Sequence, residues 1–160
     1  MEIKNLCLSL IIMKFKLNKN GFTLLEIVIV LAIIAILALI GFSAFKTVQP
    51  NLNLKGASRD LASDLRYAQQ LSVTEQVNYS VNFNKSQNSY AIVKSTTGQI
   101  IKNASLDGQI SIDNISNLTN DTASFNATGA ALQAGSITLI NLNGATSTIE
   151  IKPSGYVKIQ

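Results

Sequence analysis

The stretch "KLNKNGFTLLEIVIVLAIIAILALIG", residues 16–41, decides how this chain is organised. Its apolar run, residues 22–40, has roughly the 20 residues that an α-helix needs to cross a bilayer. Glu26 lies near the start of the run and is the only charged residue between Lys19 and Lys46. An ionised carboxylate at membrane depth costs about 2.5–3.5 kcal/mol on insertion scales, so such a residue indicates a function and a partner for its charge.

The basic residues are concentrated before the apolar run. Of the thirteen Lys and Arg residues four precede Gly21, whereas of the nine acidic residues only Glu2 does. Lys and Arg beside a membrane segment stay in the cytoplasm. We therefore expect a single-pass inner (cytoplasmic) membrane protein with its N-terminus in the cytoplasm and its C-terminal part outside, in the periplasm or the extracellular space. The sequence pI near 9.3 then reflects topology and does not by itself indicate nucleic-acid binding.

The composition excludes several classes of site. The chain has no histidine, and Cys7 is its only cysteine. A His-based triad, a His-ligated zinc and a His general base are therefore excluded, as are a disulfide framework and a thiolate metal site. Carboxylate or Ser–Lys chemistry stays compatible with the composition, but no motif points to it. We expect no catalytic residue, no metal, no cofactor and no enzymatic activity.

A second helical pattern follows the apolar run. Pro50 is expected to kink or restart the helix, because proline lacks the backbone N–H and clashes with the preceding turn. Beyond it, apolar residues recur at spacings of three and four, which predicts an amphipathic helix to about Val73. The apolar stripe consists of Leu54, Ala57, Leu61, Leu65, Ala68 and Leu71.

Alternating apolar residues indicate that the rest of the chain is made of strands. Val77, Tyr79, Val81 and Phe83 share one face of the first predicted strand. Asn143–Gly144 is a strong hairpin-turn signal. Further strands are predicted at residues 90–94, 99–102, 109–112, around Phe125, and at 136–142, 147–151 and 156–159, with residues 113–122 as a loop.

One helix followed only by about seven or eight short strands predicts an α+β fold. We expect a long N-terminal α-helix, with a membrane half and an amphipathic half, packed on a small head that is an antiparallel β-sheet or sandwich. The chain then divides into a leader (1–21), the transmembrane and assembly half of the helix (22–48), the amphipathic half (49–74) and the β head (75–160). Met13 opens a short basic leader of its own, so we expect translation to start there; a genuine extension at residues 1–12 is the alternative.

Three interpretations of the N-terminus compete. A cleaved secretory signal fits poorly, because the apolar region is too long, has no A-x-A-like site at its end and carries Glu26. An ordinary signal anchor fits the length and the flanking lysines but leaves Glu26 unexplained. The third interpretation rests on the whole pattern of the segment.

"KNGFTLLEIVIVLAIIAILALIG" closely resembles the class III signal of type IV pilins and type II secretion pseudopilins. The resemblance consists of a short basic leader, Gly21 before the cleavage point, Phe22 as the first mature residue, Glu26 as the fifth, and a long apolar helix. It implies that a prepilin peptidase cuts after Gly21 on the cytoplasmic side and N-methylates Phe22. The helix then stays attached to the mature protein.

The same resemblance implies a partner for Glu26. Cleavage creates a positive amine at Phe22, and in a filament the Glu26 carboxylate of one subunit would neutralise the Phe22 amine of its neighbour. Pairing offsets part of the cost of placing either charge in lipid, so Glu26 would select one docking register. A separate reason explains why residue 21 is a glycine: a residue without a side chain allows the peptidase to approach closely.

The remainder of the chain resembles the GspH/FimT group of minor pseudopilins. The resemblance lies in "ASRDLASDLRYAQQLSVTEQVNYSVNF" and in the C-terminal "ITL", "IEI" and "SGYVKI", and with the N-terminus it spans about residues 13–160. It implies a structural subunit that assembles with other pilins or pseudopilins into a type II secretion pseudopilus or a type IV pilus, where it helps to initiate or cap the filament.

Two alternatives remain. Some FimT-like members bind DNA in natural transformation through a basic C-terminal segment, but here that tail carries only Lys152 and Lys158. Affinity for DNA scales with the number of phosphate contacts, so we expect at most weak DNA contacts from these two residues and favour their role as solvated strand residues. The other alternative is a single-pass anchored domain that is never processed.

Overall fold

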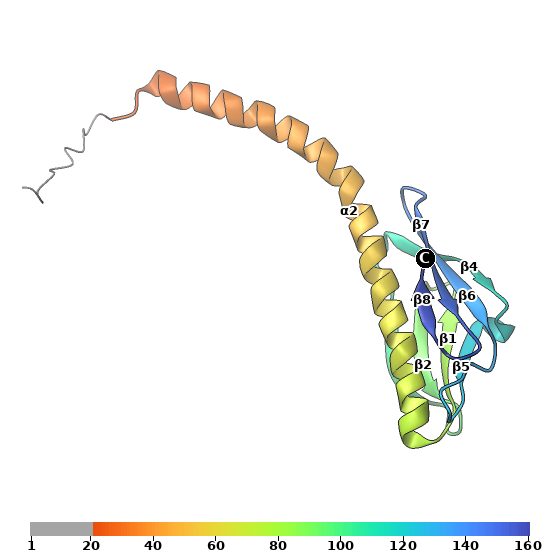
Figure 1. Ribbon diagram of the computed structural model, residues 1–160. Helices are drawn as coiled ribbons and strands as arrows, with labels where there is room; N and C mark the ends of the chain where they lie inside the picture. Colours follow the sequence, from red (N-terminus) through yellow and green to blue (C-terminus); the bar gives the residue numbers. More distant parts are fainter. Residues whose placement is uncertain (1–20) are drawn as a thin grey trace, which may run out of the picture. The chain divides into compact units, whose positions relative to one another are not determined.

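The computed structural model describes residues 21–160, without the side chains of residues 40–47. The predicted leader therefore lies outside the described residues except for Gly21, and the expected start at Met13 lies outside them too. The chain forms two compact units, Met1–Gly41 and Phe42–Gln160. A single helix, α2 (Leu24–Glu75, 52 residues), begins in the first unit and ends in the second (Figure 1).

The helix α2 is continuous through Pro50. Of the kink and the restart that the sequence left open at this proline, the restart is wrong, while the single long helix that the sequence predicted is confirmed. A proline inside a helix removes one hydrogen bond and costs about 3 kcal/mol. Pro50 is buried, and the residues that follow it pack on the head, which offsets this cost. Among the described residues, no helix combines the length and the apolar character that crossing a membrane requires.

The second half of α2 packs on the strands through the predicted stripe. Leu61, Leu65 and Ala68 are fully buried, and Leu54 is nearly so. Ala57 and Leu71 are partly buried against the same core. Burial of a leucine side chain contributes roughly 1.5–3 kcal/mol, so this stripe holds the helix on the head, and the predicted amphipathic pattern is confirmed. The helix ends at Glu75, two residues beyond the predicted end.

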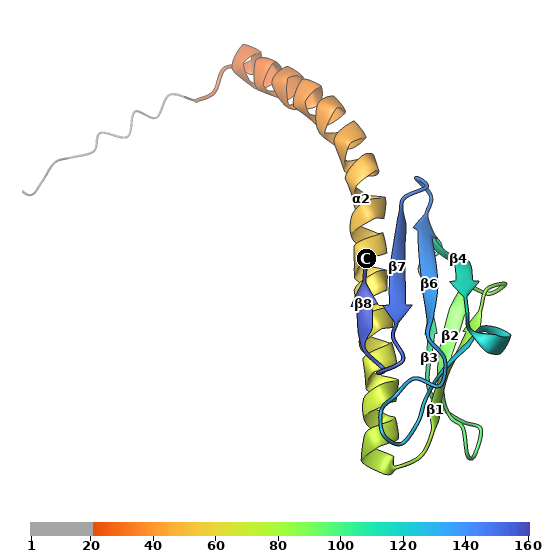
Figure 2. The ribbon, with the colours of Figure 1, turned by 45° about the vertical axis from the view of Figure 1, so that its right-hand side comes forward.

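The head contains two four-stranded sheets, and every strand pairing in them is antiparallel. The first sheet has the order β3-β2-β1-β5 and the second the order β4-β6-β7-β8. Both views of the ribbon show the second half of α2 running alongside the strands (Figures 1 and 2). The strands are β1 (Tyr79–Asn84), β2 (Ser89–Lys94), β3 (Gln99–Ser105), β4 (Ile110–Ser116), β5 (Thr122–Phe125), β6 (Gly135–Asn141), β7 (Thr146–Ile151) and β8 (Val157–Ile159).

The core lies between α2 and the two sheets. Tyr79, Val81 and Phe83 alternate with exposed or half-buried residues along β1, as the period of two predicted. In β6 the same alternation buries Ile137 and Leu139. The α+β class, with a helix packed on a small antiparallel head, is thus confirmed.

The predicted loop at residues 113–122 is wrong in its first part, because β4 continues to Ser116. The pairing of β4 with β6 shifts register between Ile112 and Asn114. Such a β-bulge inserts one unpaired residue and interrupts the alternation of side chains. Asp113 therefore lies in a strand, although the polar residues around it predicted a loop. The strand β3 likewise extends to Ser105, beyond the predicted residues 99–102.

A glycine turn ties the C-terminal hairpin to the helix. Gly155, between β7 and β8, adopts a φ of +83°, and Gly129 adopts a φ of +82°. A Cβ at Gly155 would collide with the carbonyl oxygen of Gly129 and with the amide of Gln69. The Gln69 side chain in turn donates from Nε2 to that same carbonyl at 2.6 Å. Close approach of three segments explains why only glycine fits at residue 155.

Candidate functional site

The candidate site is the start of α2, where residues 21–23 lead into the helix. Thr23 precedes the first helical residue, and its carbonyl oxygen accepts hydrogen bonds from the N–H groups of Glu26 at 3.1 Å and Ile27 at 3.2 Å. Its Oγ1 accepts a further bond from the Glu26 N–H at 3.2 Å. Thr23 is therefore the N-cap, and Glu26 occupies the third helical position, which is the sequence spacing of a T-x-x-E capping box.

Sequence reasoning missed this local role of Glu26. The signal was present, since threonine followed three residues later by glutamate marks a helix start. A carboxylate in the first turn also interacts favourably with the positive end of the helix dipole, typically by 0.3–1 kcal/mol, an order-of-magnitude range. Glu26 thus has a structural reason to follow Thr23, in addition to the intersubunit role that the sequence suggested.

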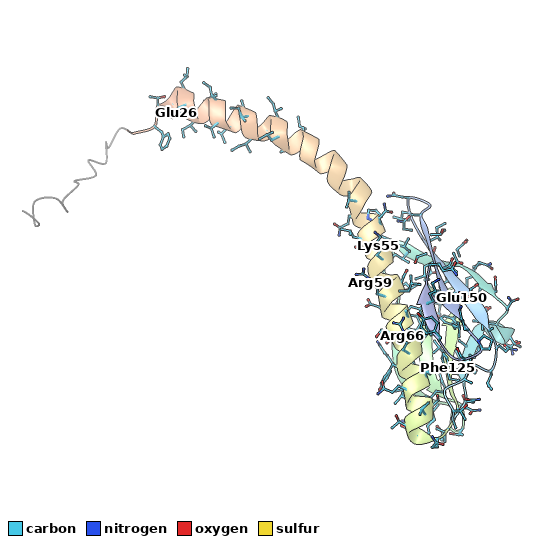
Figure 3. All side chains as sticks on the ribbon, viewed as in Figure 1. Glu26, Lys55, Arg59, Arg66, Phe125 and Glu150 are labelled. Carbon is cyan, nitrogen blue, oxygen red and sulfur yellow. The ribbon has the colours of Figure 1, made fainter. Side chains whose placement is uncertain are left out.

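The side chains around this helix start are open to solvent in the isolated chain. Phe22 is 77% exposed and Leu24 is 83% exposed. The glutamate is exposed as well, and Figure 3 labels it in the first turn of α2. The two ion pairs in the described part of the chain are Glu75–Lys94 and Asp64–Lys102, so among those residues Glu26 has no cationic partner. Its charge is available to a group from another chain.

Among the residues that the structure describes, nothing gives Gly21 a packing reason to be a glycine. A Cβ built on Gly21 meets nothing within 4 Å. Alanine would therefore fit here without a clash. The cleavage hypothesis places the need for glycine in a molecule that approaches this peptide bond.

Lys152 and Lys158 lie on the β7–β8 hairpin, and both are exposed. In the antiparallel register Lys158 stands directly opposite Glu150, so an acid accompanies one of the two cations. A third cation, Arg66 of α2, donates to the carbonyl oxygen of Val157 at 2.9 Å. The sequence did not indicate this arginine as a neighbour of the hairpin, because the contact joins residues far apart in the chain.

A buried polar cluster in the head also escaped prediction. The Asp64 carboxylate on α2, 6% exposed, accepts from the Tyr90 hydroxyl at 2.7 Å and from the Lys102 ammonium at 2.6 Å. Burial, followed by the hydrogen bond to the Asp64 carboxylate, raises the pKa of the Tyr90 hydroxyl. The cluster joins α2 to β2 and β3, which fixes the helix on the first sheet.

One surface ion pair joins the end of α2 to β2. The Lys94 ammonium lies 2.5 Å from the Glu75 carboxylate. The hydrogen bond from Lys94 lowers the pKa of Glu75, and the same bond raises the pKa of Lys94. Within the described residues no group of three or more metal-binding side chains is found.

Two family models match this chain. Residues 16–42 match the prokaryotic N-terminal methylation motif, and residues 57–155 match type II transport protein GspH. The first match contains Gly21, Phe22 and Glu26, and the second covers most of the head together with the helix segment that packs on it. No curated protein matches the chain.

Solved structures with the same fold are minor pilins and pseudopilins. The type IV minor pilin FimU of Pseudomonas aeruginosa is 14% identical with a TM-score of 0.56, over 69% of this chain and 90% of that one. The minor pseudopilin EpsH from the type 2 secretion system of Vibrio cholerae is 7% identical with a TM-score of 0.57, over 68% of this chain and 96% of that one. At these identities the likeness shows the fold.

Proposed function

The chain belongs to the family of type II transport protein GspH and is a pilin-like minor pseudopilin subunit; from this premise we propose that it is processed between Gly21 and Phe22 and assembles into a type II secretion pseudopilus. A prepilin peptidase would cut after Gly21 and N-methylate the new terminus at Phe22. Other pilins or pseudopilins would be its partners in the filament, and a type IV pilus is the alternative assembly.

The observation that carries this proposal is the position of Glu26. Its carboxylate is exposed in the first turn of α2 and has no cationic partner among the described residues. Cleavage after Gly21 would place a positive amine four residues before it. Within one subunit the Glu26 N–H is already bound to Thr23, while the carboxylate stays available to the amine of a neighbour. Pairing of the two charges offsets the cost of burying either one during assembly.

We further propose that residues 22–48 anchor the subunit in the inner membrane before assembly. Over residues 22–39, whose side chains the structure describes, the exposed surface is almost wholly aliphatic, with Leu25, Val28, Leu31 and Leu37 each more than half exposed. Such a surface needs either lipid or the helices of neighbouring subunits. The N-terminus would then face the cytoplasm, and the head would lie in the periplasm.

Incorporation of a charge-neutral variant tests the proposal. Glu26→Gln keeps the size of the side chain and is equally suited to a capping box, so it removes the charge and little else. We expect the variant to be cleaved and to remain in the membrane fraction, but to be lost from the filament, as measured by cross-linking between subunits inside cells of the native host. The matched control is Asp113→Asn, an exposed acid on β4. Equal incorporation of both variants would overturn the role of Glu26.

A DNA receptor is the second candidate, and we do not favour it. Lys152 and Lys158 supply few phosphate contacts, and Glu150 opposes one of them. Each lost phosphate contact flattens the dependence of DNA affinity on salt. The test is retention of the full chain on DNA. Retention that falls steeply between low and physiological salt, and is lost in Lys152→Ala/Lys158→Ala, would support the DNA-receptor function.

A further inference from the structure

The strand β3 is the one sheet edge that the described residues leave uncovered. It ends the first sheet, with β2 as its neighbour. The other edges each receive a contact from elsewhere in the chain. Leu132 donates its N–H to the Ser124 carbonyl of β5, the Asn88 side chain accepts from the N–H of Ile112 in β4, and Arg66 donates to the Val157 carbonyl of β8.

One device that protects such an edge, a free outward-pointing lysine, is absent here. Proteins place outward-pointing lysines on exposed edge strands to prevent pairing with other chains. The lysine of β3, Lys102, is instead bound to Asp64 of α2 at 2.6 Å. Two isoleucines remain accessible on the strand, Ile100 at 60% and Ile101 at 37% exposure. The edge is therefore seven residues long, presents two exposed isoleucines and is able to accept another strand.

An acidic cavity lies beside this edge, on the side of the sheet that faces α2. Its volume is about 540 Å³. Lys102 and Ala104 of β3 line it, and they stand opposite the buried residues Ile92 and Tyr90 of β2. Gly56 of α2 also lines the cavity, and nothing lies within 4 Å of the position its Cβ would take.

The charge of this cavity is not balanced. Asp60 of α2 and Asp107, which follows β3, both line it. Neither carboxylate has an ion-pair partner among the residues that the structure describes. The one lysine in the lining, Lys102, is already bound to Asp64. A guest with a positive side chain would supply the missing charge, while its apolar neighbours would contact Leu52 and Leu106.

We propose that β3 and this cavity together form a docking site for an extended segment of another pilin-like subunit that carries a lysine or arginine. Backbone hydrogen bonds to β3 would add the segment to the sheet, and alternate side chains would enter the cavity, because side chains of a strand alternate between faces. The lysine or arginine would lie between Asp60 and Asp107. The inference rests on the proposed function only for the source of the strand.

A second copy of this chain fits the edge poorly. Antiparallel self-pairing over the whole of β3 would place Lys102 opposite Lys102 of the second copy, and like charges directly opposite are destabilising. A strand of different sequence avoids the charge conflict, so the site favours a heterologous contact.

The test uses the purified full chain in detergent and a fluorescent, end-blocked peptide, TVTKTVT, followed by anisotropy. Its valines and lysine share one face, so one register places all three toward the cavity. We expect saturable binding, with TVTETVT binding at least tenfold more weakly. The double variant Asp60→Asn/Asp107→Asn should weaken binding of TVTKTVT by about three- to tenfold, as two partly exposed ion pairs allow. Asp113→Asn should leave it unchanged.

Backbone pairing is tested separately with the peptide itself. An added strand uses the N–H groups of alternate residues. We therefore compare two methylated forms of the peptide, one N-methylated at the valines and the lysine and the other at the threonines. One form should lose binding, and the other should keep it. Equal binding of both methylated peptides, or no saturable binding of TVTKTVT, would overturn the proposal. So would a concentration-dependent dimer that excludes the peptide. None of these readouts requires cleavage or a filament, so a failure here leaves the incorporation test of Glu26→Gln standing.

Discussion

The Thr23 hydroxyl oxygen lies 3.2 Å from the main-chain nitrogen of Glu26 and accepts its hydrogen bond. Glu26 therefore has two roles, one for its backbone and one for its side chain. Its backbone is held by the N-cap of α2, and its carboxylate, which no cation in the described residues neutralises, is directed to another chain in our account. The two roles can be separated, because one depends on the Thr23 side chain and the other on the charge of Glu26.

Thr23→Val removes the cap and keeps the carboxylate. Loss of an N-cap side chain costs about 1 kcal/mol, which corresponds to roughly fivefold faster opening of the first helical turn. Amide hydrogen exchange of the full chain in detergent micelles should show this acceleration at Glu26 and Ile27. Incorporation into the filament should persist, in contrast to Glu26→Gln. Unchanged exchange at Glu26 would mean that Thr23 does not cap the helix.

Gly21→Ala separates processing from folding. Because a Cβ at Gly21 meets nothing within 4 Å, we expect no change in the denaturant midpoint of the head. We expect the uncleaved precursor to accumulate in the native host, since the peptidase approaches this residue. Gly108→Ala is the matched control, because its Cβ also meets nothing within 4 Å. Normal cleavage of Gly21→Ala would remove the glycine requirement.

Gly155→Ala should destabilise the head. The new Cβ would collide with the carbonyl of Gly129 and the amide of Gln69, and overpacking of this kind costs about 1–3 kcal/mol. Gly144→Ala provides the control, because Gly144 has a φ of +79° but an unobstructed Cβ position. The difference between the two variants in free energy of unfolding isolates the clash from the backbone strain. Equal losses would show that the turn has room to move away from α2.

The Tyr90–Asp64 hydrogen bond predicts a loss of stability in alkali. The folded state raises the pKa of Tyr90 above the unfolded value near 10, so above pH 10 the unfolded chain releases a proton that the folded chain retains. Stability from this group is therefore fully present below about pH 10 and decreases as the pH rises further. Denaturant unfolding of the full chain between pH 8 and pH 11 should show this decrease.

Tyr90→Phe should flatten that alkaline slope, because phenylalanine does not ionise. At neutral pH the variant should be less stable by about 1.5–3 kcal/mol, the range for hydrogen bonds to charged groups. Tyr156→Phe is the control, since Tyr156 is 59% exposed. An unchanged slope in Tyr90→Phe would show that other groups determine the alkaline behaviour.

Local patterns predicted most of the fold. One face is buried both in the helix, through Leu61 and Leu65, and in the strand, through Tyr79 and Val81. Burial of one face makes apolar residues recur with the period of the helix or the strand, and this spacing is visible in the sequence. The prediction failed where a long-range contact overrides the local pattern. Packing on the head keeps α2 helical through Pro50 without a restart, and pairing of β6 with the residues on both sides of Asp113 makes Asp113 the bulge of a strand.

The candidate site could be proposed from the sequence for a different reason. Gly21, Phe22 and Glu26 are close together in the sequence, so their spacing is visible without a structure. The contacts Asp64–Tyr90–Lys102 and Gln69–Gly129 join residues that lie far apart in the chain. No local pattern encodes such contacts, and the same holds for the uncovered edge at β3.

The central claim is that cleavage after Gly21 creates the amine that Glu26 neutralises in a neighbour. The most direct test is the intact mass and N-terminal sequence of the membrane-extracted protein from its native host. The account predicts a chain that begins at N-methylated Phe22. A chain that still begins at Met13 or Met1, in a host whose prepilin peptidase is active on its other pilins, would contradict it and leave an unprocessed signal anchor.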